Sequence, residues 1–175
     1  DDNGGGVYLT AGTVRNSLIT NCAAIYGGGI YMTGGMVSNT LLASNPTKAG
    51  GGASGQGGGI YLTAGEVRGC VLNGNASTRQ GAAIRMAGVG TVSHCIIIRN
   101  SDALGGVVNV TANGRIENCL VAGNTGGSSV GGGGIYLASA GARVMNCTVV
   151  GNLTTGNGGG ILRVSGGVTN PQFSP

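Results

Sequence analysis

The sequence contains no tryptophan, one phenylalanine and three prolines, and only 8% of its 175 residues are charged. Without large aromatic side chains, a globular core of the usual kind has little bulk to fill it. The scarcity of proline excludes collagen, which also needs glycine at every third position. The low charge, with a hydrophobic fraction of 41%, excludes a disordered chain. We therefore expect a folded protein with a core of small and branched aliphatic side chains.

The sequence also lacks long apolar runs and basic clusters. No apolar stretch approaches the ~20 residues of a transmembrane helix. The net charge is +4, but the arginines are spread singly along the chain, so no basic run could follow a phosphate backbone. We expect neither a transmembrane segment nor a nucleic-acid partner. Because the chain begins at Asp1 and not at methionine, we expect a processed or excised segment.

Glycine, in contrast, is abundant, with 40 residues against a usual share of about 7%. A glycine-led block followed by an aliphatic residue recurs seven times, at intervals of 23 to 30 residues. The blocks begin near residues 4, 27, 57, 81, 105, 132 and 158. A period of this length is typical of a solenoid, in which each repeat is one coil.

A second block follows about ten residues after each first block. It reads Val67-Arg68-Gly69-Cys70-Val71-Leu72 in one coil, and an asparagine closes it three residues later. Both blocks are short, alternating and bounded by turn residues, as strands are. Two or three such strands per coil predict an all-β fold, a right-handed, single-stranded parallel β-helix of about six coils. We expect one domain over residues 1–170 and a C-terminal tail over residues 171–175.

Stacking of the coils places equivalent residues in columns along the rod. The closing asparagines are expected to form a hydrogen-bonded ladder of Asn45, Asn75, Asn100, Asn124 and Asn152. Four cysteines share one inward frame, namely Cys70, Cys95, Cys119 and Cys147. Neighbouring coils bring Cα atoms within disulfide range, but parallel stacking does not favour the dihedral angle near 90°. We expect buried free thiols in this column and Cys22 at a separate turn.

These motifs resemble the right-handed parallel β-helix repeats of the pectate-lyase-like superfamily. The pairing of Gly57-Gly58-Gly59-Ile60-Tyr61 with the turn at Leu72-Asn73-Gly74-Asn75 looks especially like the repeats of polymorphic outer-membrane proteins and autotransporter-like surface proteins. The resemblance covers essentially the whole chain. It implies a β-helix, and it implies lyases, hydrolases, adhesins or filaments alike, because this fold carries many functions.

Candidate catalytic residues are few. The acidic residues are Asp1, Asp2, Glu66, Asp102 and Glu117. Glu66 and Glu117 fall in different frames two coils apart, and Asp102 is expected in a turn, so no carboxylate pair for glycoside cleavage is predicted. The single histidine, His94, shares a frame with turn asparagines and is expected to be a turn residue. We expect no enzyme activity, no cofactor and no metal site.

The outward positions carry more information about function. The residue after each aliphatic marker points outward, in a row of Tyr8, Tyr31, Tyr61, Arg85, Asn109, Tyr136 and Leu162. The four tyrosines of this row form a strip suited to lateral contact with another rod or to a sugar. A second outward strip is apolar and comprises Leu18, Leu41, Val71, Ile96 and Leu120.

Together these features predict a non-catalytic structural module of a secreted or cell-surface bacterial protein, acting as a fibre subunit, stalk or adhesin. The expected partners are further copies of the chain, stacked head to tail or side by side, or neighbouring coils of a longer parent protein. The alternative is a β-helix that binds or degrades carbohydrate, with a glycan as partner.

Overall fold

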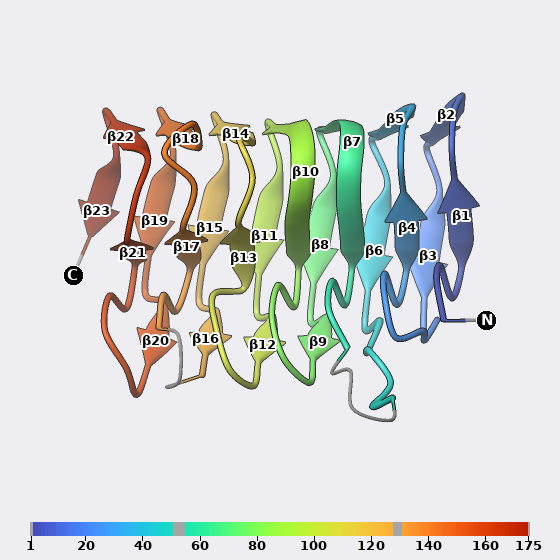
Figure 1. Ribbon diagram of the computed structural model, residues 1–175, viewed down its shortest axis with the longest axis horizontal. Coiled ribbons are helices and arrows are strands. Elements are labelled where there is room, and N and C mark those ends of the chain that lie inside the picture. The colour runs from blue at the N-terminus through green and yellow to red at the C-terminus, as the bar shows by residue number, and fades with distance from the viewer. Residues whose placement is uncertain (1, 51–54, 128–130, 175) are drawn as a thin grey trace.

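The computed structural model describes residues 2–50, 55–127 and 131–174, and all of its regular elements are strands. Successive coils lie side by side along one axis, with the N-terminus at one end of the rod and the C-terminus at the other (Figure 1). The strands of neighbouring coils pair in parallel throughout, from the first coil to the last. This is the predicted parallel β-solenoid of about six turns.

Each coil opens with a strand that follows its glycine block. These strands are β1 (Val7–Leu9), β4 (Ile30–Met32), β7 (Ile60–Arg68), β10 (Ile84–Ser93), β13 (Val108–Val110), β17 (Ile135–Leu137) and β21 (Ile161–Arg163). They stack in that order and face the viewer in Figure 1.

A second strand position follows after a short bend. It is occupied by β2 (Thr13–Arg15), β5 (Met36–Ser38), β14 (Arg115–Glu117), β18 (Arg143–Met145) and β22 (Gly167–Thr169). In two coils, β7 and β10 continue through the bend, so the two strand positions join into one 12-stranded sheet.

The chain then turns back along the opposite face of the rod. The strands there are β3 (Leu18–Thr20), β6 (Leu41–Ala43), β8 (Val71–Asn73), β11 (Ile96–Ile98), β15 (Leu120–Ala122), β19 (Thr148–Val150) and β23 (Gln172–Ser174). They form a seven-stranded parallel sheet. Here the predicted C-terminal tail is wrong, because residues 172–174 pair with β19 and so extend this sheet.

A fourth strand position was not predicted. It consists of two-residue strands, β9 (Ala76–Ser77), β12 (Ser101–Asp102), β16 (Thr125–Gly126) and β20 (Leu153–Thr154). They form a four-stranded parallel sheet just after the closing asparagines. Two residues are too few to show an alternating pattern in the sequence, which explains why these strands escaped prediction.

The core consists of stacked columns of aliphatic side chains. Ile60 pairs in register with Ile30 and Ile84, and Val67 with Val37 and Val92, and all of these side chains are fully buried. A further buried column, which was not predicted, consists of Leu9, Met32, Leu62, Met86, Val110 and Leu137. Alternation from the marker residues two positions earlier is the signal that could have identified it.

The glycine block forms a corner where neighbouring coils touch through their backbones. A Cβ atom on Gly58 would lie 2.3 Å from the carbonyl oxygen of Ala76 and 2.5 Å from that of Ala82. At Gly57 the requirement is different, because its φ of 71° lies in the left-handed region that glycine adopts without strain. Glycine is therefore needed at Gly58 because neighbouring backbones approach closely there, and at Gly57 because the backbone has a positive φ.

Candidate functional site

The asparagine ladder forms as predicted and runs through the interior of the rod. Asn75 donates from its backbone N–H and from its Nδ2 atom to the Oδ1 atom of Asn100, at 2.8 and 3.0 Å. Its Nδ2 atom also donates to the carbonyl oxygen of Leu42 at 3.0 Å. The same bonds recur from Asn45 to Asn75 and from Asn124 to Asn152. The ladder is fully engaged with the chain's own groups, so its role is structural.

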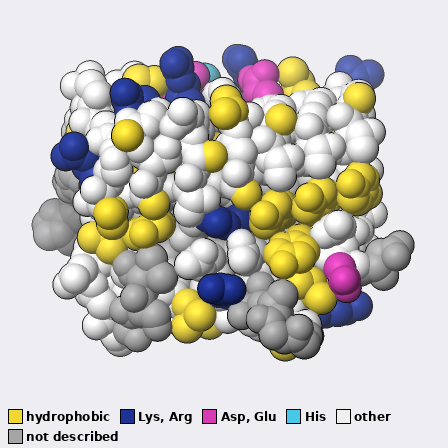
Figure 2. Space-filling model, in the orientation of Figure 1, with side chains coloured by type: hydrophobic (Ala, Val, Ile, Leu, Met, Phe, Trp, Pro, Cys, Tyr) yellow, Lys and Arg dark blue, Asp and Glu magenta, His cyan; other side chains and the backbone are white. Residues whose placement is uncertain are grey.

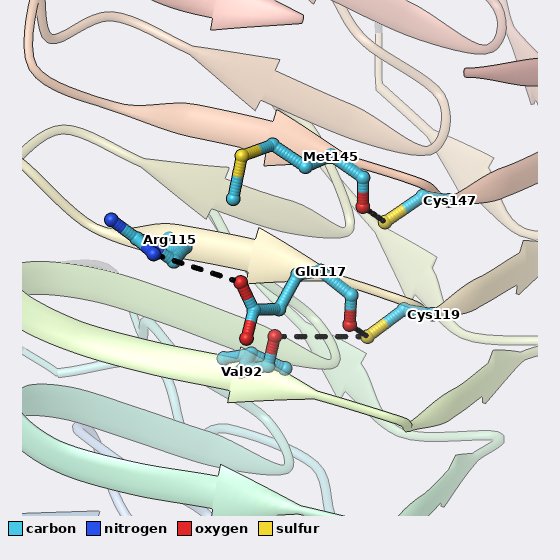
Figure 3. Close-up of polar contacts among 6 residues, drawn as sticks. All are labelled: Val92, Arg115, Glu117, Cys119, Met145 and Cys147. Carbon is cyan, nitrogen blue, oxygen red and sulfur yellow. Dashed lines mark hydrogen bonds and ion pairs between the residues drawn. The ribbon is translucent and has the colours of Figure 1, made fainter. Parts of the chain in front are cut away.

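The four column cysteines are buried, with at most 3% of any residue exposed, and their thiols are free. Each thiol donates to the carbonyl oxygen two residues earlier, as Cys119 does to Glu117 and Cys147 to Met145, both at 3.2 Å (Figure 3). The backbone N–H of Cys95 donates to the Sγ atom of Cys119 at 3.4 Å. Hydrogen bonding to the neighbouring thiol of Cys119, with burial, raises the pKa of Cys95 and of Cys147.

The residue before each column cysteine has a left-handed backbone conformation. His94 has a φ of 54°, and Asn118 and Asn146 have φ values of 54° and 51°. Asparagine adopts this conformation more readily than most residues, and histidine is also enriched in it. His94 lies at this turn, as its sequence frame predicted, and its side chain is exposed.

The carboxylates do not converge. Glu66 of β7 pairs in register with Thr91, whereas Glu117 of β14 pairs with Ser93, so the two occupy different frames. Glu117 lies 3.8 Å from the NH1 atom of Arg115 and points away from the cysteine column (Figure 3). Within residues 2–50, 55–127 and 131–174, no group of three or more His, Cys, Asp or Glu side chains is placed to hold a metal ion.

Asp102 was expected in a turn, but the structure places it in a strand. It lies in β12 with 4% of its surface exposed. Its Oδ1 atom accepts from the backbone N–H groups of Leu104 and Gly105 at 3.0 and 2.8 Å, and its Oδ2 atom accepts from that of Ala82 at 3.0 Å. Burial raises the pKa of Asp102 to about 7, against the opposing effect of these donors. The carboxyl group thus joins one corner to the next coil.

The outward row of tyrosines lies on the first strands of the coils. Tyr8, Tyr31 and Tyr61 pair in register, with ring centroids 5.1 and 5.2 Å apart and interplanar angles of 24° and 8°. Figure 2 shows hydrophobic side chains in a row across this face, ending beside a basic side chain. Because the rings stack on one another along the rod, both faces of Tyr31 are covered. Tyr136 lies further along the same row, after Asn109.

The middle of this row is polar. Arg85 follows Tyr61 in register, and Asn109 follows Arg85. Arg85 donates from Nε to the Oε1 atom of Gln56 at 2.9 Å and from NH1 to the Oδ1 atom of Asn109. Asn109 was predicted to point into solvent, but it is fully buried, and its Nδ2 atom has no hydrogen-bond partner among the described residues.

The second outward strip lies on the opposite sheet, with its side chains in register from β3 to β15. Leu18, Leu41 and Ile96 are exposed, whereas Val71 and Leu120 are half-buried. The described part of the chain contains no helix of the length and apolar character that a membrane crossing requires. The strip runs along the rod as an apolar stripe.

A family model described as a right-handed β-helix region matches residues 1–174. No curated protein and no solved structure matches the chain. The family match agrees with the parallel coils and adds their handedness.

Proposed function

This chain belongs to the right-handed β-helix family, and from that premise we propose that it is a non-catalytic structural module of a secreted or cell-surface bacterial protein. In this role it serves as a fibre subunit, a stalk or an adhesin. The observation that supports the proposal best is the unbroken stacking of the asparagine ladder and the aliphatic columns from coil to coil.

The repetitive hydrogen bonding supports this role because the same bonds form between neighbouring coils whatever the number of coils in the rod. Each coil presents to the next the same parallel strands and the same ladder groups, so stability grows by nearest-neighbour contacts. A further coil, from the same polypeptide or from another copy, would add by the same bonds. The separated carboxylates Glu66 and Glu117 and the fully bonded Asp102 support a role without catalysis.

Electron microscopy of the purified protein tests the self-associating form of this proposal. We expect rods longer than one chain, with their number increasing with protein concentration. Dispersed particles of single-chain length at every concentration would contradict self-association. Protease treatment of intact cells that produce the protein tests its location: a surface module is degraded while a cytoplasmic marker survives.

A second candidate function is carbohydrate binding or cleavage, favoured by the row of Tyr8, Tyr31 and Tyr61, of which Tyr8 is 54% exposed. The ring stacking weakens it, because a sugar stacks on a free aromatic face and the faces of Tyr31 are covered. A glycan array compares the native protein with the double variant Tyr31→Ala, Tyr61→Ala. Binding that the double variant loses would support this candidate, and absence of binding by the native protein would remove it.

A further inference from the structure

We propose that the polar centre of the outward row, formed by Arg85, Asn109 and Gln56, is a binding site for an oxyanion, with a carboxylate as the best-matched group. The inference goes beyond the structural role proposed above and does not depend on it. It rests on an imbalance of donors and charge at this point of the face.

Hydrogen-bond donors outnumber acceptors at this site. A guanidinium group has five N–H donors, and those of Arg85 make two hydrogen bonds to side chains of the described residues, with Gln56 and Asn109. The Oδ1 atom of Asn109 is engaged by Arg85, so its Nδ2 atom remains as a buried donor without an acceptor. Leaving a buried donor unsatisfied is unfavourable, so an incoming acceptor is favoured.

The charge of Arg85 is also uncompensated. Among the described residues the sole ion pair joins Arg115 and Glu117, on another strand position. Burial lowers the pKa of Arg85, and the nearby charge of Arg79 acts in the same direction. Asp102 is the acidic residue whose charge acts on Arg85. Its oxygen atoms, however, accept hydrogen bonds from backbone N–H groups. A bound anion would supply the missing negative charge.

The surroundings favour a planar oxyanion. Guanidinium and carboxylate groups match in geometry and form paired hydrogen bonds. Tyr61 precedes Arg85 in the row and Tyr136 follows Asn109, so aromatic side chains border the polar centre on both sides. Figure 2 shows basic side chains in the middle of this face, with the acidic side chains of this view toward its margins.

Nuclear magnetic resonance titration tests the site. Sodium acetate and sodium sulfate are added in separate arms at constant ionic strength, and the Nε–Hε signal of Arg85 and the Nδ2 signals of Asn109 are followed. We expect saturable shifts with acetate. Saturation with sulfate alone would overturn the carboxylate assignment, and equal, non-saturating shifts at Arg85 and Arg68 would overturn the site.

Two variants and a control sharpen the test. Arg85→Lys keeps the charge but loses the forked donors, and we expect the acetate midpoint to rise at least about fivefold. Arg68→Lys, at an exposed position at the end of β7, is the matched control and should leave the midpoint unchanged. Asn109→Asp supplies a carboxylate within the chain, so it should raise the melting temperature and abolish the response to acetate. An Asn109→Asp protein that still binds acetate like the native one would contradict the proposal.

Discussion

At the scale of single residues, the buried asparagines of the rod show two cases. The ladder asparagines are fully hydrogen-bonded, whereas another has a polar atom without a hydrogen-bond partner among the described residues. Asn100 shows the first case: the two N–H groups of its Nδ2 atom are shared among the carbonyl oxygens of Leu72 and Ile98 and the Oδ1 atom of Asn124, and its own Oδ1 atom accepts from Asn75. Asn109 shows the second case, with one atom left unpartnered. The contrast separates a structural amide from one that is available to a ligand.

Replacing Asn100 with alanine should destabilise the protein strongly. The change removes the acceptor for Asn75 and leaves its buried N–H groups unsatisfied, at a cost of about 2–4 kcal/mol. Urea denaturation followed by circular dichroism measures the loss. Asn118→Gly is the control, because Asn118 is exposed with a positive φ that glycine accepts. An equal effect of both changes would argue against the ladder as a stabilising feature.

Asp102 should make stability depend on pH. Its pKa is raised to about 7 by burial, whereas the unfolded value is about 3.9. Between these values the folded state binds more protons than the unfolded state, so stability falls as pH rises from about 4 to about 7. The midpoint of urea denaturation should decrease over this range in the native protein. Asp102→Asn should be less stable overall but lack this decrease, and an unchanged pH profile in that variant would exclude Asp102 as the source.

At the scale of elements, the corners decide where each strand begins. The glycine block brings neighbouring backbones together, and the left-handed residues before the cysteines and the closing asparagines turn the chain. Asn21, Ser44, Arg99 and Gly123 all occupy one such turn position in different coils, with φ between 54° and 60°. The conformation is therefore imposed by the coil and not by the residue type alone.

The two kinds of glycine should respond differently to substitution. Gly58→Ala forces a Cβ atom against two carbonyl oxygens, and a shift of the backbone should cost about 1–3 kcal/mol or more. Gly123→Asn is the matched control: a Cβ atom there meets nothing within 4 Å, and asparagine occupies the same turn at Asn21. Thermal denaturation of both variants compares them. A stable Gly58→Ala protein would show that the coils can separate at this corner.

At the scale of the whole molecule, the rod is a series of nearly equivalent coils, each of which contacts mainly its neighbours (Figure 1). Ile60, Ile84 and Val108 occupy one column on consecutive coils, and Asn75, Asn100 and Asn124 another. Because the register repeats, removal of one whole coil should leave the remaining coils able to form the same hydrogen bonds with one another.

Deletion of residues 84–107 should therefore leave a folded, shorter rod. The deletion joins Ala83 to Val108, which occupies the column of Ile84, and brings Leu72 beside Val121. We expect a native-like circular dichroism spectrum and a cooperative thermal transition at a lower temperature. Deletion of residues 84–95 is the control, since half a coil destroys the register and should abolish cooperative folding. Loss of folding in both would contradict the independence of the coils.

The repeat spacing was sufficient to predict the parallel coils, the asparagine ladder, the buried cysteine column and the tyrosine row, because each depends on in-register stacking of like residues. It could not reveal β9, β12, β16 and β20, which are too short for a pattern, nor the pairing of β23. The burial of Asp102 and of Asn109 also escaped prediction, because Asp102 is enclosed by backbone N–H groups of neighbouring corners and Asn109 lies in register between Arg85 and Tyr136. Register is a property of the chain's periodicity, whereas solvent exposure depends on neighbours distant in sequence, and that difference separates the predicted features from those that only the folded rod revealed.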